Sequence, residues 1–151
     1  IAKGLGFALS ILGSFLGGVL VVRWGVLITL LIGGVAVALT NLLFAALALT
    51  EPNLIWLGLI IGADNLSGGI AATSFIAYLS SLTHTAYTAT QYALFSSLMT
   101  LPGKFTSGFS GIAVDSVGYP VFFIGAGVLG IPAIVMVLYL IHRESEPIVR
   151  A

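Results

Sequence analysis

The residues that could do chemistry begin with one carboxylate inside a long apolar run. Asp64 opens the segment 64–69, DNLSGG, ten residues into the run 54–82. A charge near the centre of a membrane-spanning helix costs about 2.5–3.5 kcal/mol on insertion scales, so it normally faces other protein or a wet cavity. There it can exchange a proton or pair with a cation. The neighbouring amide of Asn65 could bond either another helix or a hydroxyl group of a ligand.

A second charge within an apolar run, Lys104, offers a partner for Asp64. Asp64 lies about 15 Å below one face of the membrane. Lys104 stands seven residues before Gly111, which places it roughly 10 Å from the same face. Charges inside membranes usually pair with one another. Two interpretations stay open: the pair is purely structural, or it separates so that Asp64 takes up a proton while a substrate binds.

Two further polar side chains lie near the ends of apolar runs. Lys3 precedes Arg23 by about one hydrocarbon thickness, so it either snorkels to the interface or faces a cavity and attracts an anionic substrate. Gln91 lies at the start of a later run. It could line the mouth of a cavity, whereas the adjacent Tyr92 fits an interfacial anchor.

The composition is that of a membrane protein. Apolar residues make up 59% of the 151 residues and charged residues only 7%, whereas a soluble domain carries about 25% charged residues. The net charge is zero, so nucleic acid is not an expected partner. The chain has no cysteine and only two histidines, so no metal site is expected. Neither a P-loop nor a G-x-S-x-G motif occurs, so neither an enzyme nor a bound cofactor is predicted.

Five apolar runs are each long enough to cross a bilayer as a helix, which takes about 20 residues. They cover about 2–22, 26–50, 54–82, 86–111 and 119–141. We therefore predict an all-α membrane protein, with transmembrane helices within residues 1–142 and a cytoplasmic tail at 143–151.

The breaks between the runs predict the orientation. Arg23, Arg143 and Arg150 fall on one side, and Glu51 and Asp115 on the other. The positive-inside rule makes the arginine side cytoplasmic, so the C-terminus is expected there. The first run begins without an initiator Met or a charged leader. We therefore expect the chain to be a piece of a longer protein rather than one that begins with a signal peptide.

Small residues recur with increments of 4, 3 and 4 on three of the runs, and such stripes predict tight helix packing. The packing glycines are expected to be Gly13, Gly17, Gly58, Gly62 and Gly69. A similar stripe follows Ser96, Thr100, Gly103 and Ser107. The same faces could also line a ligand path. The three striped runs are expected to be interior, and the runs 26–50 and 119–141 to face lipid.

An internal repeat suggests two copies of one unit. The segments 18–25 and 111–118 both read Gly-x6-Gly, at an offset of 111 − 18 = 93 residues. They close runs of opposite direction, and inverted copies of a three-helix unit are how many secondary transporters are built. A chance match in a glycine-rich chain is the alternative.

Two groups of residues resemble known transporters. The turn 23–25, RWG, resembles the loop after the second helix of each half of major facilitator superfamily transporters, although Val22 stands where an acidic residue is usual. More specifically, the segments 64–69 and 89–96, DNLSGG and ATQYALFS, resemble the AmpG-type muropeptide permeases.

The shorter segments 3–6, KGLG, and 41–44, NLLF, fit the AmpG-type pattern as well, so the resemblance spans nearly the whole chain. Two positions depart from it: Asp64 stands where Glu is usual, and Lys104 where Arg is usual. Both departures keep the charge.

The resemblance implies a permease of the bacterial inner membrane that imports anhydro-muropeptides with protons for cell-wall recycling. The chain would form most of the C-terminal half of a major facilitator superfamily fold, and the N-terminal half would be its partner. The energy would come from the proton gradient, not from a cofactor. Related permeases for acetyl-CoA or siderophores are one alternative. A membrane-embedded enzyme or an anchor subunit is another, and Asp64 argues against an anchor.

Overall fold

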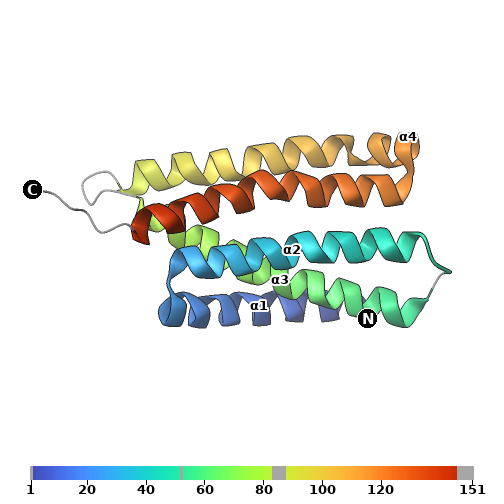
Figure 1. Cartoon of the computed structure of the whole chain (residues 1–151), viewed down its shortest axis with the longest axis horizontal. Coiled ribbons are helices and arrows are strands. Elements are labelled where there is room, and N and C mark those ends of the chain that lie inside the picture. The colour runs from blue at the N-terminus through green and yellow to red at the C-terminus, as the bar shows by residue number, and fades with distance from the viewer. Residues whose placement is uncertain (1, 52, 83–87, 146–151) are drawn as a thin grey trace, which may run out of the picture.

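The chain is helical throughout the part that the structure describes. The computed structural model describes residues 2–51, 53–82 and 88–145. Within these ranges four helices follow one another (Figure 1): α1 (Ala2–Trp24), α2 (Val26–Ala48), α3 (Leu54–Ser81) and α4 (Thr88–Ser145). No strand occurs among these described residues, so the all-α prediction is confirmed for them.

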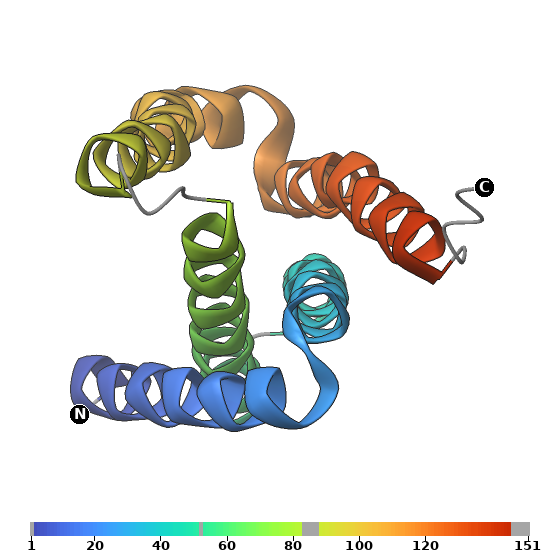
Figure 2. The same ribbon diagram turned by 90° about the vertical axis from the view of Figure 1, so that its left-hand side faces the viewer.

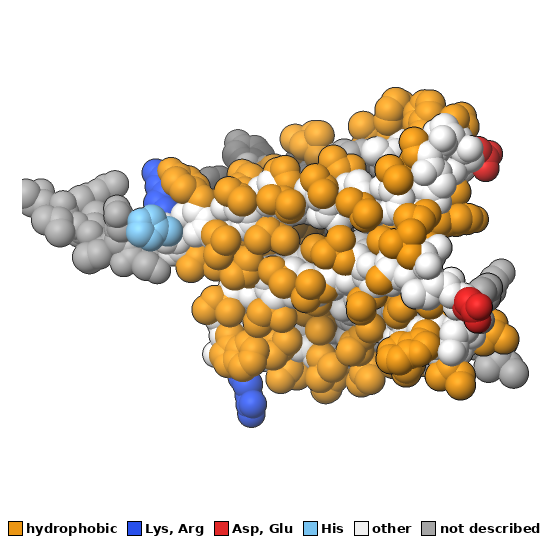
Figure 3. Space-filling view, turned by 45° about the vertical axis from the view of Figure 1, so that its right-hand side comes forward, with side chains coloured by type: hydrophobic (Ala, Val, Ile, Leu, Met, Phe, Trp, Pro, Cys, Tyr) orange, Lys and Arg blue, Asp and Glu red, His pale blue; other side chains and the backbone are white. Residues whose placement is uncertain are grey.

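All four helices are long and apolar enough to cross a membrane. Large apolar side chains lie on their surfaces: Val22 is 87% exposed, Leu54 86% and Leu129 77%. The space-filling view shows such side chains over most of the visible face (Figure 3). An apolar surface of this extent is unfavourable in water and normal against lipid or other membrane helices. The chain is a multi-pass membrane protein.

Charged side chains gather at the two ends of the helix bundle. Arg23 and Arg143 lie in the last turns of α1 and α4, at the same end of the bundle in Figure 1. Glu51 lies between α2 and α3, and acidic groups mark the opposite end in Figure 3. This separation matches the predicted one, while the assignment of one end to the cytoplasm stays a prediction. Residues 146–151 of the predicted tail lie outside the described residues.

Two glycines with nearly the same backbone geometry turn the chain at opposite ends of the bundle (Figure 1). Gly25, between α1 and α2, has φ 86° and ψ 167°, and Gly118, within α4, has φ 78° and ψ 163°. Among the described residues only these two have positive φ, in a region that is essentially restricted to glycine. They end the two Gly-x6-Gly segments, so the backbone itself supports the predicted repeat over a chance match.

Gly118 divides α4 into two helical arms that fold back on each other (Figure 1). We call residues 88–117 the first arm and residues 119–145 the second arm. The predicted runs 86–111 and 119–141 fall on these two arms. The first arm continues as helix for six residues beyond the predicted end at 111, because Gly118, not Gly111, adopts the non-helical conformation.

The helix α2 is the central element of the described chain. It packs against α3 and against the second arm of α4. A Cβ atom on Gly33 would lie 2.7 Å from the Cα atom of Ala71 in α3, and Phe44 stacks on Phe123 with ring centroids 5.1 Å apart. The prediction that 26–50 is a peripheral run is therefore wrong. The run is rich in Leu and Val, but small residues such as Gly33 allow the close contact with α3.

The first arm of α4 is the peripheral element instead. Figure 2 shows α1 and α4 on opposite sides of α3 and α2, and α3 barely touches α4. Of the predicted stripe on this arm, Thr100, Gly103 and Ser107 are exposed and Ser96 is half-buried. The expectation that this run is interior does not hold within the described chain.

Candidate functional site

The Asp64 side chain is directed at α2, where a threonine hydroxyl meets it. Asp64 is half-buried in the interior of α3, and its Oδ1 atom accepts a hydrogen bond of 2.8 Å from the hydroxyl of Thr40. Thr40 is only 4% exposed. A buried polar group needs a partner, and for this carboxylate the partner is a neutral hydroxyl rather than a cation.

Sequence reasoning did not find Thr40, although a signal was present. Thr40 precedes the end of α2 at Ala48 by eight residues, and Asp64 follows the start of α3 at Leu54 by ten. At about 1.5 Å per residue the two lie roughly 12 and 15 Å from the same connection. Similar depth on helices joined by a short loop is the pattern that would have predicted the contact.

Asn65, the next residue, contacts α1 instead of α2. The hydroxyl of Ser10 donates to Asn65 Oδ1 at 3.0 Å, and Asn65 Nδ2 donates to the carbonyl oxygen of Ile61 at 2.7 Å. Gly6 leaves room for the amide, since a Cβ atom there would lie 3.2 Å from Nδ2. The amide thus has partners at both ends and holds α1 against α3.

Three of the predicted packing glycines lie where the backbones of α1 and α3 meet. A Cβ atom on Gly13 would overlap with the carbonyl oxygen of Leu66, and one on Gly69 would lie 2.7 Å from the backbone nitrogen of Ser14. A Cβ atom on Gly17 would lie 3.0 Å from the Cα atom of Ile70. We call this contact, centred on these three glycines, the α1–α3 seam.

The other two predicted packing glycines have different surroundings. Gly62 faces only the flexible end of Leu9, 3.1 Å from the position of a Cβ atom, and Gly58 has no neighbouring atom within 4 Å. The Gly58-x-x-x-Gly62 spacing therefore makes no backbone contact within the described chain.

The predicted neighbour of Asp64, Lys104, is not brought to it. Lys104 is exposed on the first arm of α4, where Ser97, Thr100 and Phe105 surround an open pocket. Because α3 and α4 barely touch, no ion pair joins the two residues in the described part of the chain. Asp64 is therefore held by Thr40 and not by the lysine.

Two more predicted site residues lie at helix starts. Gln91 is half-buried in the first turn of α4. Lys3 falls in the first turn of α1, but its side chain lies outside the described residues.

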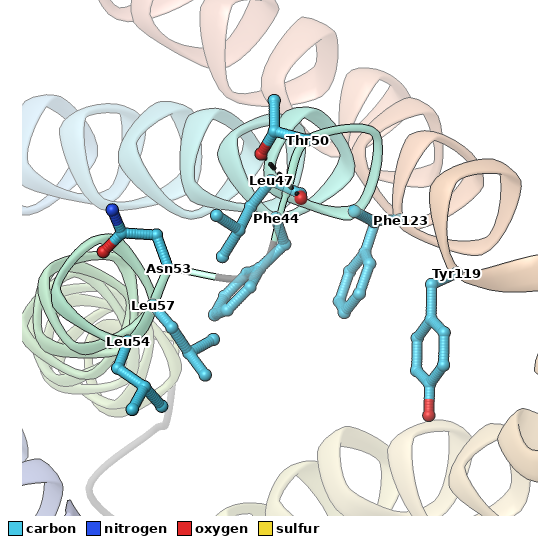
Figure 4. A pocket seen from close by; sticks show the side chains of 9 residues that line it. Phe44, Leu47, Thr50, Asn53, Leu54, Leu57, Tyr119 and Phe123 are labelled. Atoms are coloured by element: carbon cyan, nitrogen blue, oxygen red, sulfur yellow. Dashed lines mark hydrogen bonds between the residues drawn. The ribbon is translucent and has the colours of Figure 1, made fainter.

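One pocket of the described chain is mostly apolar and separate from Asp64. It has a volume of about 540 Å³ and lies where the end of α2, the start of α3 and the second arm meet (Figure 4). Phe44, Phe123 and Tyr119 form a stack along it, with ring centroids 5.1 and 6.4 Å apart. None of the predicted site residues lines this pocket.

The chemically distinctive group among the described side chains is a carboxylate. In the described ranges no group of three His, Cys, Asp or Glu side chains gathers to hold a metal ion. What stands out is one carboxylate within a membrane helix, bonded to a hydroxyl that can serve as donor or acceptor.

Comparison with known proteins finds relatives of this chain. No protein-family model matches the chain. It is 33% identical over 146 residues, 97% of its length, to a Rickettsia bellii protein named "Putative transporter AmpG 1". It is 29% identical over 136 residues, 90% of its length, to a protein of Escherichia coli K12 named "Anhydromuropeptide permease".

These relatives are named as a transporter and a permease, and the chain spans about a third of their length, 36% and 28% respectively. The chain is therefore a relative of transporters. More narrowly, it is related to the AmpG-type transporters across nearly its whole length, so the resemblance predicted from its sequence is confirmed.

Proposed function

We propose that this chain forms part of a proton-coupled secondary transporter that imports anhydro-muropeptides for cell-wall recycling. The observation that carries the proposal is the similarity, over 90% of the chain, to the Escherichia coli anhydromuropeptide permease. The proton gradient would supply the energy in place of a cofactor. The substrate would bind between this chain and the remainder of a longer transporter.

Asp64 is the residue that we assign to proton coupling. It is a carboxylate inside a membrane helix, and its described partner is the neutral hydroxyl of Thr40. No cation in the described chain pairs with it, so protonation neutralises Asp64 without leaving an unpaired positive charge in the membrane. Lys104, exposed on the first arm, and Lys3 would then attract the carboxylates of an anionic substrate, with Asn65 and Gln91 as further polar candidates.

We also propose that each arm of α4 crosses the bilayer, which makes five spans and the C-terminal half of a major facilitator superfamily fold. At about 1.5 Å per residue, the 30 and 27 residues of the arms give roughly 45 and 40 Å, more than the ~30 Å of hydrocarbon. The matched geometry of Gly25 and Gly118 supports two inverted copies of one unit. The basic end would then face the cytoplasm of a bacterial inner membrane, with the C-terminus there.

Uptake by membrane vesicles tests the proposal. The full-length protein should accumulate labelled anhydro-muropeptide only when a proton gradient is imposed, and Asp64→Asn should reduce this accumulation at least about tenfold. Asp115→Asn, which removes a carboxylate at the end of the first arm, is the matched control and should retain uptake.

Other outcomes would redirect the assignment. Accumulation of acetyl-CoA or a siderophore in place of the muropeptide would keep the transporter class and change the substrate. Full gradient-driven uptake by Asp64→Asn would remove Asp64 from the coupling role. Chemical conversion of the substrate without accumulation would indicate a membrane-embedded enzyme.

A further inference from the structure

The Thr40 hydroxyl has two acceptors within reach and only one proton to give. Its Oγ1 atom lies 2.8 Å from Asp64 Oδ1 and 2.9 Å from the carbonyl oxygen of Val37, one turn earlier in α2. A hydroxyl donates one hydrogen bond and can accept others. At any moment, therefore, Thr40 donates a hydrogen bond to only one of these two oxygens.

An ionised Asp64 fixes the direction of the bond. A carboxylate can only accept, so Thr40 donates to Asp64 Oδ1. The Val37 carbonyl does not lose its side-chain partner in this state, because Asn41 Nδ2 donates to it at 2.9 Å. Both buried oxygens therefore keep a hydrogen bond.

A protonated Asp64 reverses the bond without moving either side chain. The new O–H group of Asp64 donates to Thr40 Oγ1, and the Thr40 proton turns toward the Val37 carbonyl at 2.9 Å. The proton on Asp64 comes from the aqueous phase and returns to it, and Thr40 keeps its own proton throughout.

We propose that Thr40 is the positioning residue of the proton site: its reversible hydrogen bond lets Asp64 gain and lose a proton while staying paired. This inference rests on the proposed role of Asp64 in coupling. It places the hydrogen-bond change that follows protonation of Asp64 at the α2–α3 contact, not at a pair with Lys104.

Few charged groups compete with this contact. The helix α2 carries no ionisable residue, and on α3 itself Tyr78 lies 14 residues from Asp64. On α1 the described charged residue is Arg23, at the far end, and Lys3 has a side chain outside the described residues. On the first arm Lys104 is exposed, and α4 barely touches α3.

Three variants of the full-length protein test the proposal. Thr40→Val keeps the shape and removes the hydroxyl, Thr40→Ser keeps the hydroxyl, and Thr29→Val is the matched control. Thr29 lies on the same helix, is fully buried, and donates to the carbonyl oxygen of Gly25 at 2.8 Å, so its replacement removes a comparable hydroxyl with no carboxylate beside it.

The readout is the infrared spectrum of the purified protein at low pH, which needs no substrate. The protonated carboxyl band of Asp64 is identified by its loss in Asp64→Asn. In Thr40→Val the carboxyl group loses its hydrogen-bond partner, so the band should shift in frequency, and gradient-driven uptake should fall. Thr40→Ser should restore the band position and uptake, and Thr29→Val should leave both unchanged.

Three results would overturn the inference: no band that depends on Asp64, an unchanged band position in Thr40→Val, or an equal change of band position in Thr29→Val. Failure of the proposed function would look different. A band that depends on Thr40 in a protein that does not accumulate muropeptide would keep the proton site and reject the substrate.

Discussion

The α1–α3 seam and the first arm of α4 look alike in the sequence and differ in the structure. Both carry small residues at helical spacing. In the seam, a Cβ atom on Gly13 or Gly69 would meet backbone atoms of the facing helix, whereas Gly103 and Gly108 on the first arm have no neighbouring atom within 4 Å. A small-residue stripe therefore shows that a helix can be approached closely, but not which helix approaches it.

Polar side chains differ between the two regions in the same way. In the seam, Ser10 reaches across to Asn65. On the first arm, Thr100 and Ser107 donate to carbonyl oxygens of their own helix. These two hydroxyls are thus satisfied within their own helix, and Gly103 and Gly108 leave the small-residue face open, as expected of a surface that another part of a transporter covers.

The largest effect is expected for Gly13→Ala in the seam. The added methyl group overlaps with the backbone of Leu66, which cannot move aside as a flexible side chain can, so α1 must shift away from α3. Overpacking of this kind typically costs 1–3 kcal/mol, and we expect about 2–3 kcal/mol. The measurement is reversible unfolding of the full-length protein in detergent.

Gly18→Ala is the matched control for this prediction, because Gly18 lies on the same helix with no atom within 4 Å. Its stability should be unchanged or slightly raised, since alanine favours helix. Equal destabilisation by both variants would mean that the seam is no tighter than the open surface.

A smaller effect is expected for Gly118→Ala, at the turn between the two arms of α4, where conformation and not packing demands glycine. Its φ of 78° and ψ of 163° are strained for any residue with a Cβ atom, at a cost of about 1–2 kcal/mol. The measurement compares the unfolding free energy of this variant with that of Gly111→Ala, since Gly111 lies in open space within the helix. Unfolding that is the same in both would show that the turn does not need its glycine.

The smallest effect is expected for Ser10→Ala. It removes the hydrogen bond to Asn65 but fits the same space, and interhelical bonds in membrane proteins average only about 0.6 kcal/mol. Ser97→Ala, whose hydroxyl bonds its own helix on the first arm, serves as the comparison in the same unfolding assay. A loss above about 2 kcal/mol for Ser10→Ala would make the bond, and not the glycines, the main source of seam stability.

The helical class and the separation of charges could be predicted, because a bilayer allows little besides long apolar helices. Glycine spacing predicted turns within the segments 18–25 and 111–118, and the residues with positive φ, Gly25 and Gly118, are the last residues of these two segments. Which helices pack together could not be predicted in the same way. The close approach of Gly33 to Ala71 depends on the rotation of α2 about its axis, which a run of apolar residues does not reveal.

The candidate site was predictable in part. Asp64 attracts attention on its own, because a carboxylate in a membrane helix needs a reason to be there. Its partner could not be predicted from charge, because the opposite charge of Lys104 is a more obvious partner for a carboxylate than the neutral hydroxyl of Thr40. The depths of Lys104 and Thr40 in the membrane are both compatible with a contact to Asp64. Only the packing of α3 against α2 shows that Thr40 makes this contact.

The adjacent contacts of Asp64 and Asn65 have a mechanical consequence. Consecutive residues point about 100° apart around a helix, and here they hold α2 through Thr40 and α1 through Ser10. If α3 twists about its long axis to release one contact, it must strain the other. A change of charge at Asp64 that rotates α3 would therefore strain the contact of Asn65 with α1 as well as the contact of Asp64 with α2. The helix α3 would couple the two contacts mechanically.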